Sequence, residues 1–229
     1  MLGELGHLSA TFSRFTQDDA HFLSVTGNER RYIADIHAAG KADAFDWDVE
    51  AMGQAGSIAE DNVRAWAVGS RTGYTIAEMP WAPRLGMQID AASGNDDPHG
   101  HTLGTFNPLF PNGYYVTLSG YTGYTNFIHV KPSLTLAPTQ QMTLLLAVAG
   151  QWRETTADAV YTQPDIPVGD TAGHPGRYTG TYYQSRLDWQ VTEHFTAAVE
   201  GVRFNVARAI RDAGGHDGNY LGVEGKFGW

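Results

Sequence analysis

The stretch LGVEGKFGW, residues 221–229, ends the chain and decides its fold class. In an extended strand, successive side chains point to opposite faces. The apolar face of this strand carries Leu221, Val223, Gly225, Phe227 and Trp229. The other face carries the charged residues Glu224 and Lys226. One apolar face, one polar face and a terminal aromatic residue are typical of the closing strand of an outer-membrane β-barrel, whose outside meets lipid and whose inside meets water.

The composition agrees with an all-β domain. The chain has 229 residues, of which 27 are glycine, and only 17% are charged, which is low for a soluble protein. No apolar run approaches the roughly 20 residues of a membrane-spanning helix. Cysteine is absent, which excludes disulfides and thiolate chemistry, and the net charge of −10 argues against nucleic acid as a partner.

The two-faced pattern recurs along the chain and predicts about ten antiparallel strands. It is clearest in 44–55, where Asp46, Asp48 and Glu50 fall on one face and Trp47 and Val49 on the other. The other strands are predicted at 8–15, 31–38, 62–75, 84–92, 127–136, 142–153, 182–191 and 194–205. Pro132 argues against the segment 127–136, because proline cannot donate a hydrogen bond to a neighbouring strand.

The predicted connections alternate in length. Long connections are expected at 16–28, 94–125, 154–178 and 207–218, and a moderate one at 57–61. Short turns are expected at 39–43, 77–80, 138–140 and 192–194. Short turns at one end and long loops at the other are the arrangement of outer-membrane barrels.

Two other classes of protein remain open on the residues alone. A soluble secreted β-sandwich also alternates apolar and polar positions, and it could bind carbohydrate through exposed aromatic residues. These are Tyr114, Tyr115, Tyr121 and Tyr124. A barrel enzyme is the second alternative, but no histidine falls at a matching height beside Ser133 or Ser185, so no catalytic residue is expected.

Several short segments of the chain are distinctive. The most specific is LGTFNPLFP at 103–111, preceded by AASGN at 91–95. The others are GNERR at 27–31, DWDVE at 46–50, RAWA at 64–67, PRLG at 83–86 and QWRE at 151–154. In sequence and in order, these segments resemble the alginate export family of outer-membrane porins. The resemblance implies a passive channel in the bacterial outer membrane for an anionic saccharide such as a polyuronate, or for a related small acid.

The family's barrel is larger than ten strands. The resemblance therefore implies that residues 1–229 form a single barrel domain that is the C-terminal portion of a longer protein. The segment Met1 to Ala10 lacks the basic and apolar regions of a secretory signal. We therefore expect the signal and further strands to precede this segment in the complete protein.

Strand parity predicts which charged side chains face the lumen. The expected cations are Arg31, Arg64, Arg84, Lys131, Arg153 and Arg186. The expected anions are Asp35, Asp46, Asp48, Glu50, Asp90, Asp188, Glu200 and Glu224. The resemblance implies that the arginines attract the carboxylates of the solute, since a guanidinium binds a carboxylate with two parallel hydrogen bonds. The structural alternative is that they pair with carboxylates on neighbouring strands.

The long connection 94–125 is expected to fold inward and narrow the channel, or to pack over its rim, because its apolar run is unsuited to solvent. The expected constriction residues are Phe106, Asn107, Leu109 and Phe110. The same loop carries Asp96, Asp97, His99 and His101, but such residues are common in loops that bind no metal, and neither a metal nor a cofactor is expected.

The expected partners follow from the same interpretation. Outer-membrane lipid should meet the aromatic residues near strand ends, which are Trp47, Trp81, Trp152, Trp189 and Phe227. The barrel-assembly machinery should recognise the C-terminal Trp229. The remaining partner is the acidic solute itself.

Overall fold

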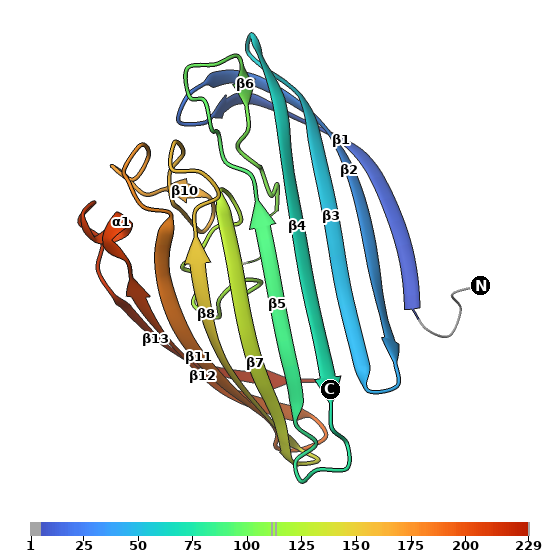
Figure 1. Ribbon diagram of the computed structural model, residues 1–229. Coiled ribbons are helices and arrows are strands. Elements are labelled where there is room, and N and C mark those ends of the chain that lie inside the picture. The colour runs from blue at the N-terminus through green and yellow to red at the C-terminus, as the bar shows by residue number, and fades with distance from the viewer. Residues whose placement is uncertain (1–5, 111, 113, 229) are drawn as a thin grey trace.

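The computed structural model describes residues 6–110, 112 and 114–228, and the terminal Trp229 lies outside them. Within that range, one sheet contains ten long strands in sequence (Figure 1). They are β1 (Gly6–His21), β2 (Thr26–Ala42), β3 (Phe45–Ile58), β4 (Asp61–Thr75), β5 (Arg84–Ala92), β7 (Phe127–Thr139), β8 (Met142–Trp152), β11 (Tyr178–Gln190), β12 (Phe195–Val206) and β13 (Gly218–Phe227). The short elements are β6 (Thr102–Leu103), β9 (Tyr161–Thr162), β10 (Ile166–Pro167) and α1 (Arg208–Arg211).

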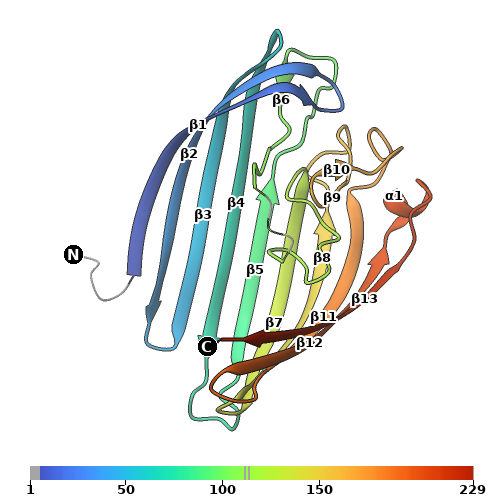
Figure 2. The same ribbon diagram turned by 180° about the vertical axis from the view of Figure 1, so that it is seen from behind.

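Each long strand pairs antiparallel with the next, so the sheet order follows the chain order. The sheet is strongly curved, and β12 and β13 curl round to one side of it (Figure 2). As described, the sheet is open, with β1 and β13 at its two edges. The predicted fold class, an antiparallel transmembrane β-barrel with about ten strands present, is confirmed.

The outward face of the sheet is apolar and exposed. Phe12 is 73% exposed, Ile36 57% and Val223 78%. These side chains alternate with residues on the inward face, which is polar and is covered by loops toward one end of the sheet. On β8, for example, Leu146 and Val148 are exposed, whereas Gln151 is buried. A sheet with water inside and lipid outside requires this distribution.

The core lies on the inward face, toward the end of the sheet that carries the long loops. Three small clusters of buried apolar side chains form there, where loops pack on strands. One joins Ala92 and Phe127 to the loop residues Phe106 and Val116. Another contains Tyr182, Phe204 and Ile210, and the third contains Ile58, Val63 and Leu103.

Most of the predicted connections are confirmed, but those at 16–28 and 57–61 are shorter than expected, and the second consists of residues 59 and 60 alone. The long loops span 93–126, 153–177 and 207–217 at one end, and short turns occupy the other end. The segment 16–28 was expected to be a long loop. Instead β1 and β2 extend through it and leave only residues 22–25 between them. Beyond the membrane, a strand can carry polar side chains on both faces, so this part of the hairpin lacks the alternating pattern that predicts a strand. Pro132 lies within β7, at a gap in the pairing of β7 with β8.

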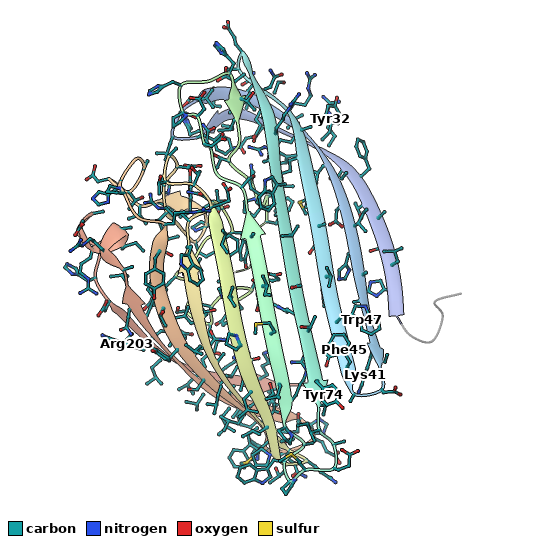
Figure 3. The ribbon with its side chains drawn as sticks, viewed as in Figure 1. Tyr32, Lys41, Phe45, Trp47, Tyr74 and Arg203 are labelled. Atoms are coloured by element: carbon teal, nitrogen blue, oxygen red, sulfur yellow. The ribbon has the colours of Figure 1, made fainter. Side chains whose placement is uncertain are left out.

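Aromatic side chains gather at the short-turn end of the outward face. Phe45 pairs with Tyr74 across β3 and β4, and its ring stacks on Trp47 at 6.0 Å (Figure 3). Trp81 and Trp189 are also exposed near this end. Their place at strand ends is that of residues at a membrane interface.

The arrangement of the sheet is incompatible with the β-sandwich alternative. In a sandwich, the apolar faces of two sheets press against each other in a dry interior. Here the apolar face is exposed along the sheet, from Leu8 in β1 to Leu221 in β13. The exposed tyrosines proposed for a sandwich instead lie in the loop 104–126.

Candidate functional site

The described residues of the loop 104–126 lie against the inward face of the sheet (Figure 2). Its backbone accepts hydrogen bonds from inward-facing side chains of several strands. Arg31 of β2 donates to the carbonyl of Thr105 at 3.1 Å, and Lys131 of β7 donates to the carbonyl of Val116 at 2.8 Å. We call this segment the inner loop. It occupies part of the lumen.

A buried hydrogen-bond network holds the middle of the inner loop. Tyr115 donates its hydroxyl proton to Asp90 of β5 at 2.8 Å, and the other carboxylate oxygen of Asp90 lies 2.8 Å from His129 Nδ1. The second ring nitrogen of His129 lies 2.8 Å from the hydroxyl of Tyr182, which donates to the carbonyl of Val116 at 2.7 Å. We call these five residues the anchor network. It links β5, β7 and β11 to the loop.

Three of the predicted constriction residues are fixed to the wall or to one another. Phe106 is buried in an apolar cluster. Asn107 exchanges two hydrogen bonds with the side chain of Gln54, at 2.6 and 3.1 Å. The amide of Leu109 donates to the side chain of Asn107 at 2.9 Å. Phe110 is 88% exposed, which leaves it as the member of this group that extends freely from the loop. Their effect on the width of the channel stays a prediction.

Arg31 and Arg84 face inward as predicted, and both are paired. Arg31 is fully buried and donates to Glu29 at 2.5 Å and to Gln54 at 2.6 Å. Arg84 forms two hydrogen bonds with Asp46 on β3, across the glycine-containing segment of β4. Arg84 keeps 29% of its side chain exposed, so that a solute in the lumen could still contact it.

Arg186 and Lys131 also lie on the inward face, whereas Arg153 follows the last residue of β8 and lies in the loop 153–177. Arg186 pairs with Asp188, Glu200 and Glu224. Arg153 is fully buried, and its guanidinium donates to backbone carbonyls of the loop 153–177. Lys131 is buried against the inner loop. These contacts correspond to the structural alternative, in which the cation stabilises the barrel.

The carboxylates predicted to face the lumen do so. Asp46 and Asp90 have the partners already described. Asp48 lies 3.0 Å from His37 on β2. Glu50 is half-buried at the edge of a cavity beneath the inner loop.

The predicted position of Arg64 is wrong. Arg64 pairs with Ala55 and shares its face of β4 with the exposed Trp66 and Val68. This is the outward face, and Arg64 is itself exposed. The segment 62–75 lacks a clean alternation, because small residues stand at many of its positions, so parity could not be assigned from its sequence.

Arg71 also faces the lumen, although strand parity did not predict it. Arg71 lies opposite Asp48 and Gln88 on the inward face and is exposed. It donates to the carbonyl of Tyr115 at 2.9 Å, and its guanidinium lies 4.3 Å from the centre of the Tyr115 ring. The available signal was Tyr74: an outward aromatic residue at the strand end places Arg71, three residues earlier, on the inward face.

Within the described residues, no group of three or more histidine and acidic side chains is arranged to hold a metal ion. No helix in the same residues is long and apolar enough to cross a membrane.

Comparisons with known proteins place the chain in a family. The profile of the alginate export family matches residues 3–224. A solved structure, described as a NanC porin in a rhombohedral crystal form, covers 98% of this chain and 98% of its own chain, with 10% identity and a TM-score of 0.44. No curated protein matches the chain. Because the family profile matches nearly its whole length, the chain belongs to the alginate export family.

Proposed function

We propose that this chain forms the wall of an outer-membrane channel that passes an acidic saccharide of the polyuronate class by passive diffusion. The observation that carries the proposal is the family match over residues 3–224. The curved sheet supports it, because an apolar outer face and a charged inner face suit a water-filled passage through lipid. Such a passage selects solutes by its width and charge and needs no catalytic group or cofactor.

The choice of an acidic solute rests on the cations that remain accessible. Arg71 is exposed beside the inner loop, and Arg84 is partly exposed one strand away. A guanidinium recognises a carboxylate with directed hydrogen bonds. Nearby carboxylates such as Asp46 compete for the same cations, and this competition keeps solute binding weak. Weak binding at several points favours passage over retention.

The experiment compares two oligosaccharides of equal length, one acidic and one neutral, in vesicles that contain the protein. The double variant Arg71→Gln and Arg84→Gln should slow entry of the acidic one about fivefold, because each guanidinium attracts a carboxylate and raises the local concentration of the anion. Entry of the neutral one should be unchanged.

Arg64→Gln is the matched control, since Arg64 lies on the same strand as Arg71 but faces outward. It should change neither rate. Equal slowing of both saccharides by the double variant would assign Arg71 and Arg84 a purely structural role and refute the proposed charge selection. A shift in gel mobility on boiling checks that every variant has folded.

A further inference from the structure

A cavity of about 220 Å³ lies between the inner loop and the wall formed by β3, β4 and β5. Four aromatic residues line it: Phe106, Tyr115, Tyr124 and Phe127. The rings of Tyr115 and Tyr124 meet edge to face at 5.3 Å, and those of Tyr124 and Phe127 lie 6.4 Å apart. The hydroxyl of Tyr124 is buried and has no hydrogen-bond partner among the described residues.

Two carboxylates complete the lining. Glu50, Gly69 and Asp90 occupy neighbouring inward positions on β3, β4 and β5. Gly69 leaves room for the Tyr115 hydroxyl beside Asp90, since a Cβ there would lie 2.4 Å from that hydroxyl. Asp90 is held by the anchor network. Glu50 forms no ion pair with a cation in the part of the chain that the structure describes, and it faces His37 across the strand pair.

Aromatic rings attract cations through the negative potential of their faces, and trimethylated ammonium groups are recognised in this way. Tyr115 already receives a cation on its ring, the guanidinium of Arg71 at 4.3 Å. Glu50, which has no cation partner among the described residues, lies at the edge of the aromatic cavity and adds attraction for a second, mobile cation.

We propose that this cavity binds a small organic cation of the quaternary alkylammonium class. An anion is disfavoured, because Glu50 and Asp90 would repel it. A neutral apolar molecule would remove water from Glu50 without compensating its charge, which costs free energy. A metal ion would find too few oxygen ligands among aromatic walls. A quaternary ammonium group supplies both the apolar surface and the positive charge.

The test uses the full chain folded in detergent micelles, with calorimetry as the readout. Choline is the probe, and 3,3-dimethylbutanol, which has the same shape without the charge, is its neutral counterpart. Choline should bind at least about tenfold more tightly than the alcohol, in line with cation–π attraction in a partly desolvated site. Equal affinity for the two compounds, or no binding of choline, would overturn the proposal.

Two variants locate the site. Glu50→Gln should weaken choline binding about tenfold, since the attracting charge is removed, and it should not weaken binding of the alcohol, which no longer desolvates a charged group. Tyr124→Leu should weaken choline similarly while keeping the cavity apolar. Asp188→Asn, an inward carboxylate on β11, is the control and should have no effect. Choline affinity that is insensitive to both Glu50→Gln and Tyr124→Leu would refute this location. Because binding is measured without transport, the result is independent of the proposed channel function.

Discussion

At the scale of single residues, Arg153 shows how a buried charge can organise a loop. Its guanidinium donates to the carbonyls of Asp158, Thr171, His174 and Gly176, which are spread along the loop 153–177. Lysine at this position has one compact donor group instead of a planar fork. We expect Arg153→Lys to lower the free energy of unfolding by about 2 to 3 kcal/mol, since several buried carbonyls lose their donors.

The measurement is urea unfolding in micelles, together with cleavage of the loop by a protease. Arg203→Lys provides the control, because Arg203 is an exposed arginine on β12 whose partners are other side chains (Figure 3). Unchanged stability and unchanged cleavage of Arg153→Lys would contradict the role given to Arg153.

Arg153 also illustrates the limit of what strand parity can predict. Alternation correctly placed Arg31, Arg84 and Arg186 on the inward face, because side-chain direction follows from position in a strand. It could not show that loop carbonyls surround Arg153 or that Glu29 pairs with Arg31. Those contacts depend on the register and on the path of the loops, which local periodicity does not determine.

At the scale of elements, the inner loop depends on the anchor network. Tyr182→Phe removes the hydroxyl that donates to the carbonyl of Val116 and contacts His129. The loss of a buried hydrogen bond costs about 1 to 2 kcal/mol, which is enough to populate detached forms of the loop. We therefore expect single-channel recordings of Tyr182→Phe to show brief steps to higher conductance. Tyr183→Phe, next in sequence and exposed on the outward face, should give the steady current of the unmodified protein. Steady current from Tyr182→Phe as well would argue against the network as a restraint.

The loop 153–177 contains a second element-scale contact, between Asp165 and the inner loop. Thr125 donates its hydroxyl proton to Asp165 at 3.1 Å, and burial raises the pKa of Asp165, which lies outside the strands, to about 6. A carboxyl whose pKa is raised in the folded protein binds more protons there than in the unfolded chain. The contribution of Asp165 to the free energy of unfolding therefore falls as the pH rises toward 6, and it stays low above that pH. Cleavage of the loop by a protease should be slower at pH 5 than at pH 7, and Asp165→Asn should remove the difference. If cleavage of the Asp165→Asn variant depended on pH in the same way, a group other than Asp165 would be responsible for the dependence.

The elements themselves divide into those that local pattern predicts and those that it does not. The strands 44–55 and 84–92 were predicted nearly to their ends, since one lipid-facing and one water-facing side impose a period of two. The hairpin of β1 and β2 beyond residue 16 was missed, because it extends past the apolar band and loses that pattern. The inner loop could be predicted to be unusual from its length and apolar run, but its contacts with β5, β7 and β11 could not.

At the scale of the whole molecule, the arrangement depends on which solvent each face of the sheet meets. Leu146 and Ala147 are neighbours on β8 and point to opposite faces, Leu146 outward and Ala147 inward. Lysine on the lipid-facing side of a barrel costs about 2 to 4 kcal/mol at the bilayer midplane, whereas a lumen position tolerates it. Leu146→Lys should therefore reduce the fraction that folds into lipid vesicles, measured by gel mobility with and without boiling, while Ala147→Lys should fold like the unmodified chain. If the outward face met water instead of lipid, Leu146→Lys would be harmless, and equal folding of the two variants would refute the membrane-spanning arrangement.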